Sequence, residues 1–434
     1  MIAATLMSVL AGCGPSSAAS ILVANPQVGD DDPGDTAGTE AGQSDTGPAG
    51  HEPYAADESL GDQPAVESDW IFDSTLIHSV EIVIDDTSWY NLLNFPYEYT
   101  GADISVDGIP APDVGVRLRG KIGSFRPITG KPKFKIDFNQ YQSDRRFFGL
   151  KSLSLNNAVV DCSYEKEIVG YEVLRQVGLP AARIAYADVT VNAVDYGLYL
   201  LLESEDKPFL ARNYVDDSGN LYDGKYDYDY TTGGYTLIDF LDSVDDLFQL
   251  EEGTDVALAD IFAITATAAV NYGGPDYQGG LDPYLDWSVF HRTIATEQWL
   301  GHNDGYALNT NNYRVYFDPA DGKADIIAWD LDYAFLEDSW WGMNWWYPLG
   351  TLARGCWYDP NCLSAQRDAA AEVTASIDTS LLAEKLSAWD TLSAERAYAD
   401  PRRECSVENV AAYRQFVREW LAYRPGYMQS FWGF

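Results

Sequence analysis

Two stretches of the chain carry oxygen-bearing side chains at the ends of apolar runs. The first reads His302-Asn-Asp304-Gly-Tyr-Ala-Leu-Asn309-Thr-Asn311-Asn312, and the second reads Ile326-Ile-Ala-Trp329-Asp330-Leu-Asp332. Carboxylate and amide oxygens are the ligands that hard cations such as Mg²⁺ prefer in proteins. A further carboxylate can orient a hydroxyl nucleophile for attack on a phosphate. The two stretches therefore hold the side chains that metal-assisted phosphoryl transfer requires.

Spacing within the first stretch gives its residues candidate roles. His302-x-Asp304-x-x-x-x-Asn309 matches the H-x-D-x-x-x-x-N spacing of a protein-kinase catalytic loop. On this basis Asp304 is the candidate catalytic residue, Asn309 is a candidate metal ligand, and Asp330 and Asp332 are the candidate metal-binding carboxylates. Asp and Asn are also common in loops, so these residues alone equally fit a turn-rich connection with solvated acids.

The elements around these residues can position them. Helical periodicity over residues 286–300 leads into Asp304, and residues 326–329 read as a short buried strand. A buried strand that stops on Asp-x-Asp places its carboxylates at the rim of a site. One loop would then offer a proton acceptor and amide oxygens, and the next would offer metal-binding carboxylates.

A basic cluster is expected from two neighbouring strands. Residues 114–120 and 131–138 alternate apolar and polar side chains, as half-buried strands do. The apolar positions face a core, and the basic positions, Arg117, Arg119, Lys133 and Lys135, face the other way. A loop that contains Ser124 joins the two strands. Lysine and arginine in such a cluster suit the oxygens of a polyphosphate, although a solvated strand face gives the same pattern.

Residues 161–177 read as a helix that Asp161 or Ser163 caps. Glu165 and Glu167 fall in its first turns. Either glutamate can pair with a strand lysine, as the helical glutamate of a kinase does. Both can also simply favour the positive end of the helix, and the sequence leaves the choice open.

A hairpin completes this part of the chain. Residues 185–191 and 197–202 read as its strands, and the second strand ends on Glu203. Six strands around one helix would make a small lobe. Further helices are predicted over residues 86–93, 256–270, 286–300, 378–388 and 406–423.

The charge of the chain is strongly negative. Its 434 residues include 67 acidic and 28 basic side chains, which gives a formal net charge of −39. This charge argues against nonspecific binding to nucleic acid or to anionic lipid. With 46% hydrophobic residues the chain can bury a sizeable core. Its apolar runs are shorter than a transmembrane helix requires.

The N-terminal residues form a short apolar segment that ends in Leu10-Ala11-Gly12-Cys13, which resembles a bacterial lipobox. Cleavage before Cys13 and lipidation of this cysteine would anchor an exported chain to the bacterial membrane or cell surface. The basic region that usually opens an export signal is absent, so a plain apolar terminus is the alternative. Residues 14–70 are rich in Gly, Ser, Ala, Asp, Pro and Thr, and we expect a disordered acidic tether.

Four further cysteines can form two disulfide bonds. Cys356 and Cys362 would close a small loop, which leaves Cys162 and Cys405 as the second pair. An even number of cysteines in an exported chain predicts disulfides. A zinc site is a poor alternative, because none of the scattered histidines lies at ligand spacing from these cysteines.

Two other segments have more than one interpretation. Residues 214–235 are rich in Tyr, Asp and Gly, which allows a Ca²⁺ site. The EF-hand spacing is not met, and a solvated loop is the simpler interpretation. The aromatic stretch at residues 340–347 can form a protein-recognition surface or pack into the core.

Five blocks of the sequence, in order, resemble the CotH kinase family, which is named for the spore coat protein H. The similarity runs from about residue 77 to 340. The blocks are Val114-Gly-Val-Arg-Leu-Arg119-Gly120, Lys131-x-Lys133-x-Lys135-x-Asp137-Phe138, Gly197-Leu-Tyr199-Leu-Leu-Leu-Glu203, Asn311-Asn312-Tyr313 with Asp304 before it, and Trp329-Asp330-Leu-Asp332-x-x-Phe335. Five blocks in the right order are far more specific than any one of them.

The resemblance implies an atypical protein-kinase fold of the α+β class with two lobes. A β-rich N-lobe with one main helix is expected over about residues 71–205, and a mostly helical C-lobe over about 206–434. The domain at 71–434 would then follow the lipoprotein signal segment at 1–13 and the tether at 14–70.

The resemblance also implies an activity, namely transfer of phosphate from ATP, with Mg²⁺ or Mn²⁺, to Ser or Thr of exported proteins. Asp304 would be the catalytic-loop aspartate, Asp330 and Asp332 would hold the metal ion, and Lys133 or Lys135 would hold the ATP phosphates. The candidate ATP-binding residues are Arg119, Ser124, Lys133, Lys135 and Glu203.

The metal-binding asparagine has two candidates. The family pattern points to Asn312, which directly precedes Tyr313. Kinase spacing points to Asn309. The loop at 305–310 is longer than the kinase spacing allows for, which favours Asn312 as the metal-binding residue.

A rival hypothesis is a non-catalytic surface lipoprotein of the same fold, either kinase-like without activity or a Ca²⁺-dependent binding module. Such a protein would hold a partner through the aromatic stretch and the acidic loops. A degenerate kinase is expected to lose Asp304 or Asp330, and the chain keeps both. The residues therefore favour catalysis.

Overall fold

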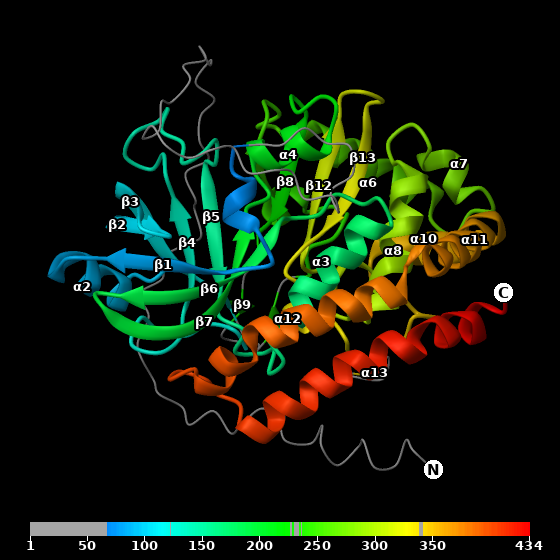
Figure 1. The fold of residues 1–434 in the computed structure, drawn as a ribbon. Helices are drawn as coiled ribbons and strands as arrows, with labels where there is room; N and C mark the ends of the chain where they lie inside the picture. Colours follow the sequence, from blue (N-terminus) through cyan, green and yellow to red (C-terminus); the bar gives the residue numbers. More distant parts are fainter. Residues whose placement is uncertain (1–66, 122, 226–227, 230–233, 236, 338–341) are drawn as a thin grey trace. The chain divides into compact units, whose positions relative to one another are not determined.

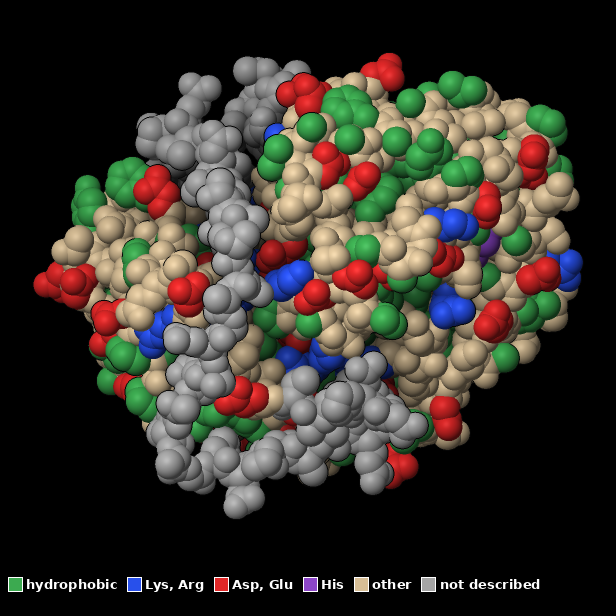
Figure 2. All heavy atoms as spheres, turned by 90° about the horizontal axis from the view of Figure 1, so that it is seen from above, with side chains coloured by type: hydrophobic (Ala, Val, Ile, Leu, Met, Phe, Trp, Pro, Cys, Tyr) green, Lys and Arg blue, Asp and Glu red, His purple; other side chains and the backbone are tan. Residues whose placement is uncertain are grey.

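The computed structural model describes residues 67–434 apart from positions 122, 226–227, 230–233, 236 and 338–341. The predicted lipidation site at Cys13 and the predicted tether up to residue 66 lie outside the described residues. The described chain is mixed α+β, as predicted, with most strands before residue 204 and most helices after it (Figure 1). Acidic side chains are scattered over the face shown in Figure 2.

Seven strands form a closed barrel in the first part of the chain. The strand order is β1-β2-β3-β4-β5-β7-β6, and parallel pairing of β1 with β6 closes it. The strands are β1 Ile77–Val83, β2 Thr100–Val106, β3 Ile109–Arg119, β4 Lys133–Asp137, β5 Ser152–Asn156, β6 Ile184–Val191 and β7 Val194–Glu203. The short helices η3 Asp69–Phe72 and α2 Asp86–Asn94 precede β1 and β2.

Alternation in β3 and β4 fills the barrel core as predicted. Val116, Leu118, Phe134 and Ile136 are fully buried in one apolar cluster made mainly of strand residues. The prediction of six strands around one helix was wrong. The strands close on their own apolar side chains, and helix α3, Lys166–Gln176, instead packs against β6 and against elements of the second part.

The second part combines a four-stranded antiparallel sheet with helices. The sheet order is β11-β8-β12-β13, with β8 Asn220–Gly224, β11 Phe248–Glu252, β12 Tyr313–Asp318 and β13 Lys323–Ala328; a two-stranded sheet pairs β9 Tyr228–Asp229 with β10 Gly234–Tyr235. The first helices are α4 Lys207–Asn213, α5 Val244–Leu247, α6 Ala259–Asn271, α7 Tyr277–Leu281, α8 Trp287–Leu300 and α9 Tyr306–Asn309. The remaining ones are η4 Leu331–Tyr333, α10 Thr351–Tyr358, α11 Pro360–Ser376, α12 Thr379–Ala399 and α13 Val407–Trp432.

Several helix boundaries differ from the predicted ones. The helix predicted from residue 161 begins at Lys166, because the Asp161 carboxylate accepts hydrogen bonds from the backbone N–H groups of Ser163 and Lys166 and holds a turn. Helix α12 continues to Ala399 instead of ending near 388. Within the described residues, none of the helices combines the length and the apolar character that crossing a membrane requires.

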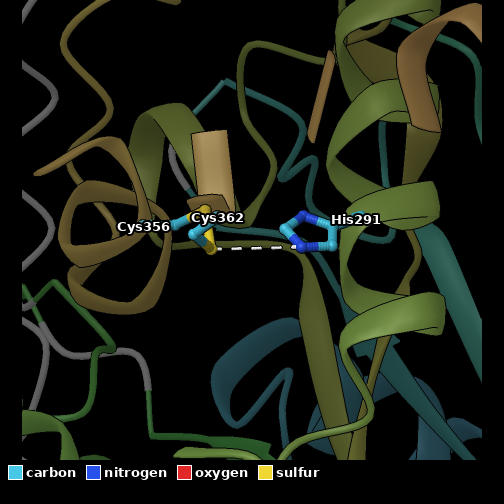
Figure 3. A group of neighbouring side chains, drawn as sticks. All are labelled: His291, Cys356 and Cys362. Atoms are coloured by element: carbon cyan, nitrogen blue, oxygen red, sulfur yellow. Dashed lines mark hydrogen bonds between the residues drawn. A yellow bond between two sulfur atoms is a disulfide. The ribbon is translucent and has the colours of Figure 1, made fainter. Parts of the chain in front are cut away.

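Both predicted disulfide bonds are present. Cys356 of α10 is joined to Cys362 of α11, and Figure 3 shows the imidazole of His291 facing this pair. His291 Nε2 lies 3.9 Å from Cys362 Sγ, and Gln366 holds the opposite ring nitrogen at 2.8 Å. Because the two sulfur atoms are bonded to each other, neither is a thiolate. The second bond joins Cys162 to Cys405.

Glu203, predicted to bind ATP, ends β7 inside a buried ion network. Its carboxylate accepts hydrogen bonds from Arg183 Nη2 at 2.6 Å and from Arg212 Nη2 at 2.5 Å. Arg183 also pairs with Asp69 at 2.5 Å. Burial opposes ionisation, but the two arginines outweigh it and lower the pKa of Glu203 to about 2. Glu203 thus joins the end of β7 to α4 through Arg212 and to η3 through Arg183 and Asp69.

Replacing Glu203 with glutamine should lower the free energy of unfolding by about 3 kcal/mol at about pH 7, because two buried arginines lose their counter-charge. The folded-state pKa lies below the unfolded value, so this stabilisation is complete above about pH 4.5 and is lost as the pH falls toward about 2. The difference between variant and wild type should shrink over that interval in urea denaturation curves. A difference independent of pH would contradict the ionised pair.

Candidate active site

Asp304 lies in the connection from α8 to α9, and three asparagine side chains surround its carboxylate. Asn309 Nδ2 donates to Asp304 Oδ1 at 2.6 Å, and Asn311 Nδ2 donates to the same oxygen at 3.3 Å. Asn312 Nδ2 donates to Asp304 Oδ2 at 3.0 Å. Burial raises the pKa of Asp304 to about 6, and the asparagine hydrogen bonds counteract part of this rise. The carboxylate is therefore held in a fixed orientation by neutral donors.

The backbone of this loop is fixed from helix α8. The Glu297 carboxylate accepts hydrogen bonds from the N–H groups of Tyr306 at 2.9 Å and Ala307 at 3.1 Å, at the start of α9. Helix α8 begins at the cap Asp286, whose side chain accepts from Ser288 N and Val289 N. These bonds satisfy the free N–H groups of two helix ends. No pattern in the sequence marks Glu297 for this role.

Asn312 connects the Asp304 loop to the second acidic stretch. Its side-chain amide reaches the backbone oxygen of Asp330 at 3.4 Å, and its own backbone oxygen accepts from Trp329 N at 3.1 Å. Asn312 and Asp330 both have a positive φ, 49° and 48°. Asn and Asp enter this left-handed region at a lower cost than most residues. The residue types at these positions thus suit both the backbone geometry and the chemistry.

Lys133 of β4 pairs with both acids of the second stretch. Its ammonium lies 3.0 Å and 3.2 Å from the two carboxylate oxygens of Asp330 and 2.8 Å from Asp332 Oδ2. Burial opposes its charge, but the two carboxylates outweigh burial and raise the pKa of Lys133. Burial alone would raise the pKa of Asp330, but Lys133 and Arg119 hold it below its ordinary value. Burial, together with Asp330, raises the pKa of Asp332 to about 7.

Glu167 of α3 lies beside this ion cluster. Asn156 Nδ2 donates to its Oε1 at 2.8 Å, whereas its Oε2 is buried without a hydrogen-bond partner among the described residues. Burial and the charge of Asp330 raise the pKa of Glu167 well above its ordinary value, and Lys133 partly offsets the rise. The other predicted candidate, Glu165, points elsewhere, with Oε1 3.7 Å from Arg414 Nη1.

Helix α3 approaches η4 closely at a glycine. A Cβ added to Gly170 would lie 2.7 Å from Leu331 Cδ1, so this helix position requires a small residue. The hydroxyl of Tyr171 also accepts from Asp330 N at 3.3 Å. Glu167 is thereby fixed relative to the Asp330–Asp332 segment.

The four basic strand residues share one face of the β3–β4 pair, as predicted. Arg117 lies opposite Lys135, and Arg119 lies opposite Lys133. Their side chains diverge, however. The Arg119 guanidinium lies 5.5 Å from the centre of the Trp329 ring, and Lys135 Nζ donates to Ser204 Oγ at 2.7 Å. Lys133 is thus the strand lysine that the structure brings to Asp330 and Asp332.

The loop between β3 and β4 reaches the same site. Gly123 has a φ of +88°, and a Cβ there would lie 2.3 Å from Tyr333 Oη, directly after the two acids of η4. Ser124, a predicted ATP-binding residue, is buried, and its backbone oxygen accepts from Asn157 Nδ2 at 3.1 Å. The sequence could have pointed to Asn311 and Tyr333, which adjoin predicted residues, but it contains no pattern that marks Asn157.

The donor atoms fit a hard divalent cation, provided that the Lys133 ammonium moves away from the two carboxylates. Asp330, Asp332 and Asn312 offer carboxylate and amide oxygens, which Mg²⁺ and Mn²⁺ prefer. In this structure the Lys133 ammonium holds the two carboxylates. The buried, unpartnered oxygen of Glu167 gives Lys133 an alternative acid. His302 is fully buried, and burial lowers its pKa to about 4, so it adds no positive charge to the site.

The other candidate sites have weaker support. In the segment 214–235, part of which lies outside the described residues, Asp216 accepts from Ser218 N, and Asp223 pairs with Arg314 at 3.2 Å. The one group of three His, Cys, Asp or Glu side chains close enough to share an ion, among the described residues, is His291 with the disulfide pair. In the aromatic stretch, Trp345 is buried in the core, and Trp346 is 44% exposed.

One curated relative is similar to about half of this chain. It is the inner spore coat protein H of Bacillus subtilis (strain 168), which is 23% identical over 231 residues. The aligned region covers 52% of this chain and 60% of that protein. The similarity therefore spans less than two thirds of the relative.

A sequence model of the family described as CotH kinase protein matches residues 116–428. The matched region begins within β3 and ends within α13. It includes Lys133, Glu167, Asp304, Asn312 and the Asp330–Asp332 pair. Because it covers well over half of the sequence, the chain belongs to the CotH kinase family.

Proposed function

We propose that the chain is a protein kinase that transfers the γ-phosphoryl group of ATP to Ser or Thr hydroxyls of exported or cell-surface proteins. The observation that carries the proposal is the buried cluster in which Asn312 joins Asp304 to the segment of Asp330 and Asp332. In this proposal the barrel part serves as a kinase N-lobe, and the helical part serves as the C-lobe. Membership of the CotH kinase family supports a kinase-like transferase.

Phosphoryl transfer depends mainly on positioning and on neutralisation of charge. Asp304 accepts the hydrogen bond of the substrate hydroxyl and aligns it with the phosphate. Asn309 and Asn311 hold Asp304 in that orientation. Asp330, Asp332 and Asn312 would hold Mg²⁺ or Mn²⁺, which supplies the charge that neutralises the phosphate oxygens. Asn309, whose amide is 2.6 Å from Asp304, fits the positioning part better than the metal-binding part.

Lys133 and Glu167 have linked parts in this proposal. Lys133 keeps two buried carboxylates neutralised before the nucleotide binds. Once released from them, Lys133 can pair with Glu167 and contact phosphate oxygens. Arg119, Lys135 and Ser124 are the further candidates for phosphate contacts from the same strand pair and its loop. Glu203 stays outside the ATP site in this assignment, because arginines engage both of its oxygens.

The proposed location is outside the cytoplasm. The two disulfide bonds are consistent with an exported protein. Lipidation of Cys13 would anchor the chain to the membrane or cell surface, with the predicted acidic tether between the anchor and the kinase domain. The client would then be an exported protein with accessible Ser or Thr residues.

A non-catalytic binding protein of the same fold is the second candidate. It is favoured by one observation, namely that the Lys133 ammonium already holds Asp330 and Asp332. A stable arrangement of this kind would need no metal ion. Thermal shift separates the two candidates, because a ligand that binds only the native state must raise the melting temperature. Mg²⁺-ATP should raise it relative to EDTA if the chain is a kinase.

Asp304→Asn should reduce phosphate transfer by at least about 100-fold, because the substrate hydroxyl loses its proton acceptor. Nucleotide binding should remain, since Asp304 does not hold the phosphates. Transfer of radiolabelled phosphate from ATP to the chain itself or to casein, with Mn²⁺ or Mg²⁺, measures the first effect, and thermal shift measures the second. Equal transfer by variant and wild type would remove Asp304 from the reaction.

Asp330→Asn should weaken metal-dependent ATP binding by about tenfold or more, because one charged oxygen donor is lost. The thermal shift with Mn²⁺-ATP should fall accordingly, and the shift without metal should not change. Asp282→Asn, on an exposed surface acid that pairs with Lys323, serves as the matched control. If both variants keep the full metal-dependent shift, Asp330 is not a metal ligand.

Glu167→Gln should raise the KM for ATP roughly tenfold, because Lys133 loses the charged partner that orients it toward phosphate. Glu165→Gln is the matched control at the N-cap of the same helix, where the carboxylate faces Arg414 instead. Initial-rate kinetics at varied ATP compares the two variants. An equal rise in both would show that the effect comes from helix α3 as a whole and would rule out a specific part for Glu167.

A further inference from the structure

The segment that joins α12 to α13, residues 400–406, contacts the loop that joins β3 to β4, residues 120–131. Ionic and polar contacts connect the two segments. Asp400 Oδ2 accepts from Lys131 Nζ at 2.6 Å, and Arg402 Nη1 donates to Thr129 O at 2.9 Å. Arg126 and Glu404 form a two-bond ion pair. These contacts join residues more than 260 positions apart in sequence.

The centre of this contact is a buried charge pair. The side chains of Lys131 and Asp400 are 1% and 0% exposed. Asp400 Oδ2 also accepts from Leu198 N at 3.0 Å and from the Tyr164 hydroxyl at 3.1 Å. A Cβ at Gly197 would lie 2.1 Å from Asp400 Oδ1, so the strand requires glycine there. An aspartate that receives this many donors in the interior is fixed in one place.

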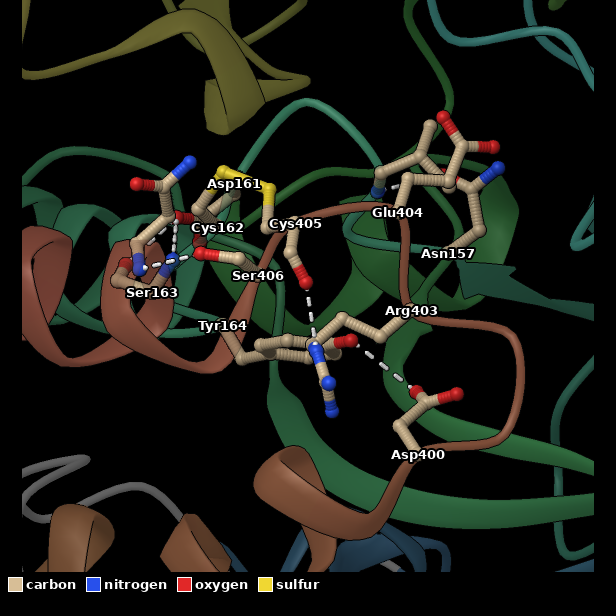
Figure 4. The surroundings of a disulfide bond; sticks show 12 residues. Asn157, Asp161, Cys162, Ser163, Tyr164, Asp400, Arg403, Glu404, Cys405 and Ser406 are labelled. Carbon is tan, nitrogen blue, oxygen red and sulfur yellow. Dashed lines mark hydrogen bonds between the residues drawn. A yellow bond between two sulfur atoms is a disulfide. The ribbon is translucent and has the colours of Figure 1, made fainter. Parts of the chain in front are cut away.

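The Cys162–Cys405 disulfide ties the same segment to a third one. Cys162 lies between β5 and α3, four residues before the first helical residue of α3. Figure 4 shows Tyr164 between the disulfide and Asp400, to which its hydroxyl donates a hydrogen bond. Nearby, the buried Asn157 donates to Ser124 O at 3.1 Å and to Lys131 O at 2.6 Å. Segments 120–131, 157–164 and 400–406 therefore form one cross-linked unit.

This unit borders the proposed ATP site on two sides. The loop 120–131 brings Gly123 against Tyr333 and leads directly into Lys133. The segment 157–164 leads into α3, which carries Glu167. The positions of Lys133 and Glu167 relative to each other thus depend on elements that the disulfide joins.

We propose that residues 400–406 form a brace that positions the loop 120–131 for the phosphates of ATP, and that the Cys162–Cys405 bond makes this positioning depend on an oxidising environment. The inference rests on the proposed function, since it assigns ATP affinity to the braced state. Reduction by an external dithiol converts the bond to two thiols while the donor becomes a disulfide. The brace then depends on its noncovalent contacts alone. The chain would reach full ATP affinity only in a compartment that keeps the bond oxidised.

A purely stabilising disulfide predicts a different result. Loss of such a bond lowers the folded fraction and hence the apparent kcat, and leaves the KM for ATP unchanged. Loss of the brace raises the KM for ATP, because ordering the loop 120–131 when ATP binds then reduces the net binding free energy. The Cys356–Cys362 bond provides the matched control, because it lies in the second apolar core away from the loop 120–131.

The test compares the full chain with Cys162→Ser/Cys405→Ser and with Cys356→Ser/Cys362→Ser. Hydrogen–deuterium exchange reports the order of residues 120–131 without requiring activity, and initial-rate kinetics gives the KM for ATP. The first variant should show faster exchange in 120–131 and a roughly three- to tenfold higher KM for ATP. The second should keep the wild-type values of both. Asp400→Asn, with the disulfide intact, should also show faster exchange in 120–131. This variant replaces the first one in the comparison if the first one does not fold.

Unchanged exchange in 120–131 after loss of either Asp400 or the Cys162–Cys405 bond would overturn the brace. An equal rise of the KM in both disulfide variants would also overturn it. If wild type neither binds ATP nor transfers phosphate, the proposed function fails. The exchange result then still decides whether the brace orders the loop.

Discussion

Lys133 joins the two parts of this molecule through a buried ion cluster. Lys133 comes from the barrel, and Asp330 and Asp332 come from the segment after β13 in the second part. Two carboxylates with no cation between them would be strongly unfavourable in a buried environment. The ammonium satisfies this constraint when no nucleotide is present. In the proposed reaction Asp330 and Asp332 would hold a metal ion that supplies this positive charge, so the two cations would be alternatives for one site.

The remainder of the site follows from that pairing. Asp304 carries no positive partner in the described structure and depends on neutral asparagine donors, so it retains the capacity to accept a hydrogen bond from a substrate hydroxyl. Glu167 keeps one oxygen unpartnered beside the cluster. Gly123 of the loop 120–131 lies against Tyr333, the residue after Asp332, and Lys131 at the end of this loop pairs with Asp400. Each group is positioned by a different element, which makes the site sensitive to the arrangement of the two parts.

The sequence predicted the local structure well where periodicity is strong. The alternation in β3 and β4, the helix α8 and the buried strand before Asp330 were all correct, because the apolar spacing of each determines its buried face. Prediction from the sequence failed where tertiary contacts determine which segments become strands or helices. Six strands were expected, but the barrel has seven, and helix α11 had no predicted counterpart.

The choice between Lys133 and Lys135 shows the same limit at the site. Both lie on one face of one strand, about 7 Å apart, so only the position of the second acidic segment decides which lysine reaches it. The prediction that Glu203 binds ATP has the same weakness. Its partners Arg183 and Arg212 lie outside the strand that carries it, and no local pattern in the sequence predicts that they pair with it. The acidic and asparagine-rich stretches could be recognised because kinase-like chemistry needs those residue types at those spacings.

We expect a divalent cation to replace the Lys133 ammonium at Asp330 and Asp332 when nucleotide binds. Diffraction from crystals grown with Mn²⁺ and a non-hydrolysable ATP analogue tests it directly, because the anomalous signal of manganese locates the ion. We expect manganese bound by Asp330 and Asp332, with the Lys133 ammonium moved toward Glu167 and the phosphates. Nucleotide bound elsewhere, with Lys133 still paired to both carboxylates, would contradict it.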